Sequence, residues 1–119
     1  KQFFDIPIII LNNQQLNNSN LTKINLNLFQ EIISTIKYSK INFNSFYSDL
    51  KKIIILDNHY ELFYMDKTKI FISKNNAKEQ LKYLSIFKDT VKEKRLLENY
   101  LYIDMRIENQ IIVKENKLI

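Results

Sequence analysis

The stretch Tyr100-Leu101-Tyr102-Ile103-Asp104-Met105-Arg106-Ile107-Glu108 contains the clearest strand signal of the chain. Aliphatic side chains alternate along it with aromatic or charged ones, and a period of two predicts a β-strand with one face toward the core. The face expected to point inward consists of Leu101, Ile103, Met105 and Ile107. Glu108-Asn109 then predicts a tight turn into a last strand from Gln110 to about Lys114, so we expect a C-terminal hairpin.

Three further strand-like runs lie upstream of this hairpin. They cover Lys52 to Leu56, Tyr60 to Met65 and Lys69 to Ser73. Short polar connectors separate the runs, and this spacing is typical of antiparallel hairpins, so the sequence predicts a β-meander. Because the chain has no Gly, we expect Asp57 and Asn58 to adopt the left-handed backbone conformation in the first connector.

Two amphipathic helices are predicted, one on each side of the meander in the sequence. The first runs from Leu21 to about Tyr38, and Ser19 or Asn20 would cap it. Its apolar stripe consists of Ile24, Leu28, Phe29, Ile32, Ile33 and Ile36. The second runs from Asn76 to Phe87 or beyond, with a stripe consisting of Ala77, Leu81, Leu84, Phe87 and Val91.

The other segments are less regular. Ile6 to Leu11 is predicted to form an opening strand, and the polar run Asn12 to Asn20 a loop. Ile41 to Leu50 fits either a loop or a short helical turn. Thr90 to Asn99 either extends the second helix or forms a short helix with Leu96 and Leu97 inward.

The order of these elements indicates the fold class. Strand, helix, three strands, helix and hairpin together predict a single α+β domain over residues 1–119, with a largely antiparallel sheet and two amphipathic helices. The sequence has no internal repeat and no linker-like segment, so one domain is expected.

The composition excludes several classes of enzyme. The chain contains no Gly, so it has no Gly-rich phosphate loop and no dinucleotide-binding fingerprint. It contains no Cys, which excludes disulfides, thiolate metal sites and a Cys nucleophile. His59 is the only His. We therefore expect no enzymatic activity, no cofactor, no metal site and no small-molecule substrate.

Three carboxylates in or near the connectors could still act together. A hairpin could bring two of the residues Asp57, Glu61 and Asp66 together, as in an acid–base pair or a site for a hard metal ion. Their spacing matches no known ligand loop, and acidic residues are common in exposed turns. We favour the second interpretation.

The net charge of +5 suggests an anionic partner, but its origin admits two explanations. Sixteen of the eighteen basic residues are Lys, and Ile and Asn are also abundant, which is what an AT-rich genome encodes. The alternative is a nucleic-acid surface in which rings stack on bases among the lysines. Its candidate residues are Tyr60, Phe63, Tyr64, Lys67, Lys69 and Phe71. We favour a core role for these rings and do not expect nucleic acid as the main partner.

The hairpin has an outer face on which Tyr102, Asp104 and Arg106 lie two residues apart. A two-residue turn would place Arg106 opposite Ile111 and Asp104 opposite Val113, and a turn one residue longer would turn Ile112 outward. Either register leaves apolar area on a terminal strand that could accept a strand from another chain. Arg106 would then serve as a planar, bidentate donor to a partner, or simply form a surface pair with Asp104.

These closing residues resemble a known motif. Tyr102-Ile103-Asp104-Met105-Arg106, followed by Asn109-Gln110-Ile111-Ile112-Val113-Lys114, is similar to the "Y-I-D-L-R" strand and final strand of the β domain in the FtsQ/DivIB family of bacterial cell-division proteins. Asp5-Ile6-Pro7-Ile8-Ile9 resembles the "l-P-v-i" that opens that domain. The resemblance covers nearly the whole chain. Where the family usually has Gly, this sequence has Asn12, Lys67 or Thr68, and Ser73.

The resemblance implies a non-enzymatic scaffold of the divisome that supports septum formation. In this family a transmembrane helix and a POTRA domain, both absent from this chain, precede the β domain, which implies a single-pass protein on the extracytoplasmic (periplasmic) face of the inner membrane. The expected partners are FtsB/DivIC and FtsL, one of which adds a strand to the hairpin. Arg106 would pair with a partner carboxylate. The expected edge consists of Gln110, Ile111, Ile112 and Val113. The alternative function is a basic α+β domain that binds nucleic acid.

Overall fold

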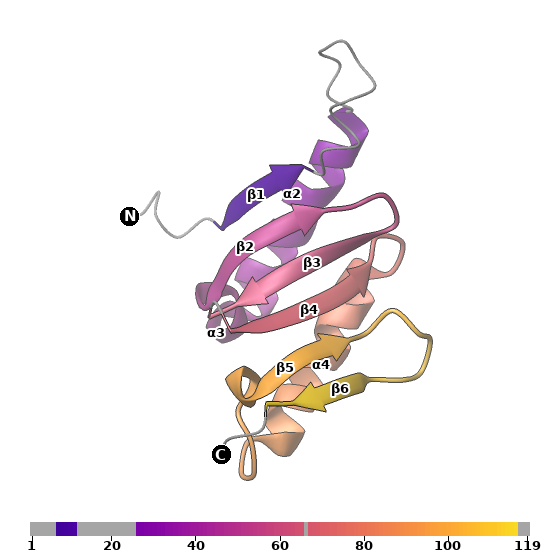
Figure 1. The fold of residues 1–119 in the computed structure, drawn as a ribbon. Helices are drawn as coiled ribbons and strands as arrows, with labels where there is room; N and C mark the ends of the chain where they lie inside the picture. The colour runs from indigo at the N-terminus through magenta and orange to yellow at the C-terminus, as the bar shows by residue number, and fades with distance from the viewer. Residues whose placement is uncertain (1–6, 12–25, 66, 117–119) are drawn as a thin grey trace.

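The computed structural model describes residues 7–11, 26–65 and 67–116. Within these ranges the chain forms six strands, three α-helices and one 3₁₀ turn (Figure 1). In chain order they are β1 (Ile8–Leu11), α2 (Leu26–Asn42), α3 (Asn44–Ser48), β2 (Leu50–Ile55), β3 (His59–Tyr64), β4 (Thr68–Ser73), α4 (Ala77–Val91), the turn Leu97–Asn99, β5 (Tyr100–Asp104) and β6 (Ile112–Glu115).

The six strands form one mixed sheet in the order β1-β2-β3-β4-β5-β6. The meander β2-β3-β4 is antiparallel, as predicted, and so is the pair β5 and β6. The pairs β1–β2 and β4–β5 are parallel. Each of these two pairs is connected through helices, which return the chain to the end of the sheet where it started. The α+β class is therefore confirmed, but the sheet is mixed rather than largely antiparallel.

The helices α2 and α4 lie on one face of the sheet, and the other face is open in the described part of the chain (Figure 1). The core fills the layer between the helices and the sheet. One row of residues crosses all six strands on this buried face, in register from neighbour to neighbour. The row consists of Ile9, Ile53, Leu62, Ile70, Ile103 and Val113.

The first helix extends to Asn42, four residues beyond the predicted end at Tyr38. Of its apolar stripe, Ile32 and Ile36 are buried, but Ile33 is 40% exposed and does not widen the buried face as expected. The predicted start of the helix lies outside the described residues, as do three predicted cap and stripe residues. These are Ser19, Asn20 and Ile24.

The segment between α2 and β2 forms a short helix, α3, so the helical alternative is confirmed there. Two of its aromatic side chains, Phe46 and Tyr47, are buried. The ring of Phe46 stacks on that of Tyr64 at 5.4 Å between centroids, which closes one end of the core.

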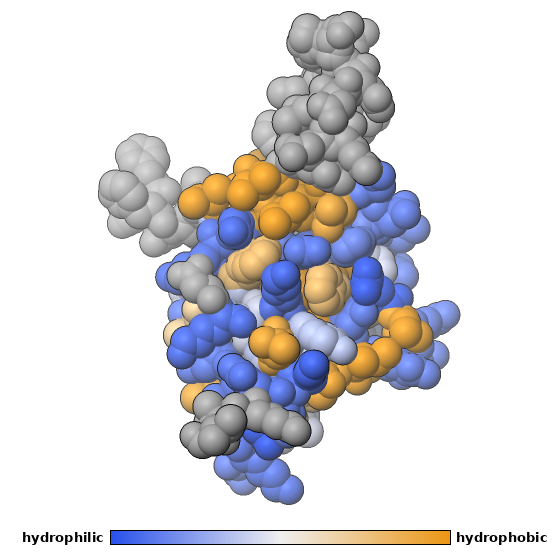
Figure 2. All heavy atoms as spheres, in the orientation of Figure 1, coloured by the Kyte–Doolittle hydropathy of each residue, from blue (hydrophilic) through white to orange (hydrophobic). Residues whose placement is uncertain are grey.

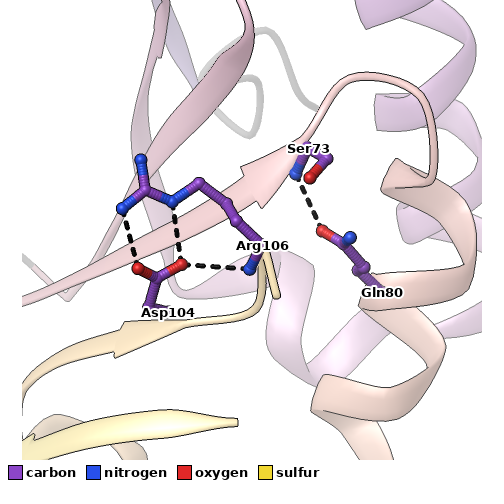
Figure 3. A network of polar contacts seen from close by, with 4 residues as sticks. All are labelled: Ser73, Gln80, Asp104 and Arg106. Carbon is purple, nitrogen blue, oxygen red and sulfur yellow. Dashed lines mark hydrogen bonds and ion pairs between the residues drawn. The ribbon is translucent and has the colours of Figure 1, made fainter. Parts of the chain in front are cut away.

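The second helix forms as predicted, with Ala77, Leu81 and Leu84 buried. Its Gln80 side chain accepts a hydrogen bond from the Ser73 backbone N–H at 2.8 Å, which fixes the helix to the end of β4 (Figure 3). After the helix the chain makes a 3₁₀ turn, in which Leu97 is buried.

Several side chains near β5 point the other way from the prediction. Leu101 is 43% exposed and Tyr100 is buried, although strict alternation predicts the reverse. The register with β6 shifts between Tyr100 and Tyr102, so a bulge offsets the alternation at the start of the strand. Ile107 is exposed because the strand ends at Asp104. Leu96 is also exposed, because the backbone N–H of Leu96 binds the Asn99 side chain in a capped turn facing solvent.

The left-handed residues also differ from the prediction. Among the described residues, positive φ values occur at Met65 (53°) and Asn109 (63°), and not at Asp57 or Asn58. The backbone N–H of Met65 donates to the Asp49 carbonyl at 2.9 Å, which holds this unusual conformation at the end of β3.

Two matched substitutions test which leucine near the start of β5 points into the core. Leu97→Ala should lower the free energy of unfolding by about 2–5 kcal/mol, because it leaves a cavity in the core. Leu101→Ala should lower it by less than about 1 kcal/mol, because that side chain is largely in solvent. Urea denaturation monitored by circular dichroism measures both values. Equal losses would show that Leu101 points inward and that the bulge is absent.

Candidate functional site

The terminal strand β6 lies at one edge of the sheet and pairs only with β5 among the described strands. Its register places Ile112 opposite Asp104 and Val113 opposite Ile103. The predicted pairing of Asp104 with Val113 is therefore wrong, whereas Ile112 faces outward, as the alternative with a longer turn predicts. The ladder between β5 and β6 stops at Asp104, and a seven-residue loop, 105–111, replaces the predicted tight turn.

This loop decides what the predicted edge residues can do. Asn109 takes the left-handed conformation within it, and the Gln110 N–H donates to the Ile107 carbonyl at 3.1 Å. Gln110 and Ile111 thus belong to the loop, although the sequence predicts that they lie in the terminal strand. The edge backbone begins at Ile112, which is exposed on the open face, whereas Val113 packs against the core.

Arg106 and Asp104 form a two-pronged ion pair at the end of β5 (Figure 3). The guanidinium donates from Nε to Asp104 Oδ1 at 2.8 Å and from Nη2 to Oδ2 at 2.7 Å. The Arg106 backbone N–H also donates to Oδ1, at 3.0 Å. Planar Arg matches carboxylate in this way and Lys does not. The surface pair considered from the sequence is thus present, and it uses one edge of the guanidinium.

Three aromatic rings lie near this ion pair on the open face of the sheet. The Arg106 guanidinium lies 4.8 Å from the centroid of the Phe71 ring, a cation–π distance. Phe71 is also neighboured by Tyr102 at 6.2 Å and by His59 at 6.0 Å between ring centroids. The predicted outer-face residues Tyr102, Asp104 and Arg106 are therefore brought together around Phe71, a contact that the sequence did not indicate.

The pair shifts the protonation of its members and of His59. The side-chain hydrogen bond from Arg106 holds the pKa of the Asp104 carboxyl below its usual value. The same bond raises the pKa of Arg106. Burial lowers the pKa of His59, and the nearby positive charge of Arg106 lowers it further. At neutral pH the site therefore carries one hydrogen-bonded ion pair beside a neutral imidazole.

A groove lies beside the loop, between it and α4. It has a volume of about 510 Å³, and its lining combines apolar and polar side chains. Its exposed hydrophobic side chains come from both walls and consist of Tyr83, Ile86, Ile107 and Ile111. Two carboxylates, Glu79 and Glu108, also line it, and no Lys or Arg does. Sequence reasoning missed this groove because it assigned Ile107 to the core, although the exposed Tyr83 and Ile86 lie off the predicted stripe of α4.

The structure separates the residues of the nucleic-acid alternative onto two faces. Tyr60 and Tyr64 are buried in the core, which bears out the favoured interpretation for those two rings. Phe63, Lys69 and Phe71 lie on the open face and are partly or fully exposed. The surface that remains is thus smaller than predicted and lies on one side.

The structure describes two of the three carboxylates considered from the sequence. Glu61 lies on the open face, Asp57 in the turn before β3, and Asp66 outside the described residues. Across residues 7–11, 26–65 and 67–116, no group of three or more His, Cys, Asp or Glu side chains is placed to hold a metal ion. None of the helices in this part of the chain is long and apolar enough to cross a membrane.

No protein-family model matches the sequence, and no curated protein matches it. The resemblance to the FtsQ/DivIB family therefore depends on its motif residues, and the functional argument depends on the geometry of the edge, the ion pair and the groove.

The single His allows the electrostatics of the site to be measured directly. Arg106→Gln should raise the pKa of His59, because it removes the positive charge that disfavours the imidazolium and leaves the Asp104 carboxylate uncompensated. NMR titration of the imidazole resonances gives this pKa without overlap. Lys74→Gln, which removes a weaker influence, should raise it less. An unchanged pKa in Arg106→Gln would mean that Arg106 does not lie near His59 in solution.

Proposed function

We propose that this chain is a non-enzymatic interaction domain of the FtsQ/DivIB type. It binds the FtsB/FtsL (DivIC/FtsL) pair by accepting a strand along β6 and so supports septum formation at the extracytoplasmic face of the bacterial inner membrane. The observation that carries this proposal is the position of β6 at the edge of the sheet, directly after a loop that holds Arg106 and forms one wall of the groove.

The backbone of the edge strand is the main feature that a partner could bind. A strand at the edge of a sheet presents unpaired N–H and C=O groups that another chain can bind. The strand β6 is only four residues long, so the backbone alone gives a small contact. Specific recognition needs side chains on either side of it. The loop that precedes β6 supplies two candidates, Arg106 and one wall of the groove.

Arg106 can bind a partner carboxylate without giving up Asp104. Its fork to Asp104 uses Nε and Nη2, and the described residues offer Nη1 no acceptor. Guanidinium has five donors, so a second carboxylate can approach the free edge. The fork and the Phe71 ring hold the side chain in one orientation, which lowers the entropy lost on binding.

The groove accounts for affinity beyond the backbone contacts. A partner strand paired with β6 extends past Ile112 toward Ile111, which lies in the groove wall. An apolar side chain at that end of the partner can therefore enter the groove. Burial of apolar area in such a pocket is typical of the residues that dominate binding energy.

The role of Arg106 is tested by calorimetric titration of this domain with the soluble FtsB/FtsL pair of the same genome. Arg106→Glu should abolish measurable binding, because it replaces attraction of a partner carboxylate by repulsion. Lys37→Glu makes the same charge change on the exposed side of α2 and should bind as the wild type does. Circular dichroism checks that both variants are folded. Undiminished affinity of a folded Arg106→Glu domain would contradict the proposed role.

The groove is tested by a second pair of substitutions in the same titration. Ile86→Glu places a charge in the groove wall and should weaken partner binding at least about tenfold, as expected for a hot-spot position. Ile86 is 52% exposed, so the fold should tolerate the change. Ile41→Glu is the matched control at a position 79% exposed at the end of α2. Equal affinity for both variants would remove the groove from the interface.

A further inference from the structure

The open face of the sheet carries a row in which lysines and aromatic rings alternate from strand to strand. Cross-strand pairing places the side chains of this row next to one another on β2, β3, β4, β5 and β6. In that order the row consists of Lys52, Phe63, Lys69, Tyr102 and Lys114. No such regularity occurs in the row on the buried face, which is aliphatic throughout.

A third ring extends this surface in the adjacent row. Phe71 on β4 pairs with Glu61 on one side and Asp104 on the other, and its ring lies 6.2 Å from that of Tyr102. Phe63, Phe71 and Tyr102 are all partly exposed, and they occupy the three central strands β3, β4 and β5. Figure 2 shows this face, with hydrophobic and hydrophilic side chains interleaved over its centre.

These rings are not needed for the core. Both α2 and α4 pack on the opposite face, where Tyr60 and Tyr64 are buried. Aromatic rings that gather on an open sheet face, rather than singly, are typical of an interaction surface. Two cations lie over one of these rings: Lys52 Nζ lies 4.4 Å and Lys69 Nζ 5.8 Å from the centroid of Phe63. Both ammonium groups therefore lie close to a ring on which a base could stack.

This surface is positively charged, and its lysines can bind an anion. Among the described residues, ion pairs join Arg106 to Asp104 and Arg95 to Glu115, and none involves Lys52, Lys69 or Lys114. The pair at Arg106 is neutral as a unit. Glu61 is the one remaining carboxylate in the two described rows. The lysines can therefore turn from the rings toward phosphates without breaking a salt bridge.

We propose that this open face binds single-stranded nucleic acid. Bases stack on Phe63 and Tyr102, on either side of the Phe71 ring that the Arg106 guanidinium covers, and the phosphates are neutralised by the lysines of the alternating row. Open sheets backed by helices bind single strands in this way, because every base has a face that can stack on a ring and each phosphate requires a nearby cation. Charge complementarity and the three exposed rings together favour this ligand over an uncharged or ring-free one. This site includes the Lys114 side chain of β6 but not the outer backbone edge of that strand. It does not rest on the function proposed above and is an alternative to it, because a domain on the extracytoplasmic face does not meet nucleic acid.

The test measures binding of the 119-residue chain to fluorescein-labelled oligothymidine and oligouridine of about twelve nucleotides by fluorescence anisotropy. Saturable binding at low salt is expected for at least one of them, and the tighter of the two shows whether DNA or RNA is preferred. The logarithm of the affinity should fall with the logarithm of salt concentration with a slope near about −2, as expected for three neutralised phosphates.

Two variants separate stacking from charge. Phe63→Leu keeps an apolar side chain but removes the stacking face, and should weaken binding about fivefold or more. Lys69→Gln should reduce the magnitude of the salt slope by about 0.7. Lys82→Gln removes the same charge from the exposed side of α4 and should leave the slope unchanged. Phe63 and Lys69 lie outside the β6 edge, so a failure here is distinct from a failure of FtsB/FtsL binding.

Three results would overturn the proposal. The first is no binding of either oligonucleotide at low salt. The second is equal affinity of the wild type and Phe63→Leu, or equal competition by inorganic polyphosphate, since either would mean that bases do not stack. The third is a loss of slope in Lys82→Gln as large as in Lys69→Gln, which would assign the effect to net charge and not to this face.

Discussion

The structure depends on burying one face of the sheet and only one. Ile53, Leu62, Ile70 and Ile103 meet side by side on four neighbouring strands, and the helices α2 and α4 cover them. Because both long helices pack on the same face, each must return the chain across that face, and the strands it connects become parallel neighbours. The mixed topology and the face left open in the described part of the chain both follow from this single burial.

Much of this architecture could be predicted from periodicity alone. The meander, the two long helices and the α+β class rest on repeats of two and of three or four residues, which burial enforces over many positions. The errors lie where a single position changes the pattern. A bulge reverses Tyr100 and Leu101, and the end of the ladder at Asp104 moves Ile107 and Ile111 from a hairpin into a loop. Turn geometry fixes such details, and a chain without Gly gives few signals of where turns occur.

The candidate site was predictable in its residues but not in its arrangement. Alternation placed Tyr102, Asp104 and Arg106 on one face, and the structure brings them together around Phe71, a residue of β4. The sequence could not show this neighbour, because it depends on the parallel pairing of β4 with β5. The groove was not predicted for a different reason: its walls come from α4 and the loop 105–111, where the sequence predicts a tight turn.

The two proposed surfaces meet at Arg106, and their independence follows from how this side chain is held. Its guanidinium covers Phe71 on the open face, and its fork to Asp104 leaves Nη1 without an acceptor among the described residues. A partner carboxylate that binds the free edge has no need to break the fork, because the two interactions use different nitrogen atoms. A base that stacks on Phe63 lies on β3, two strands away from β5. One face of the sheet packs against the helices and stabilises the fold. The edge at β6 and the open face can therefore bind different ligands.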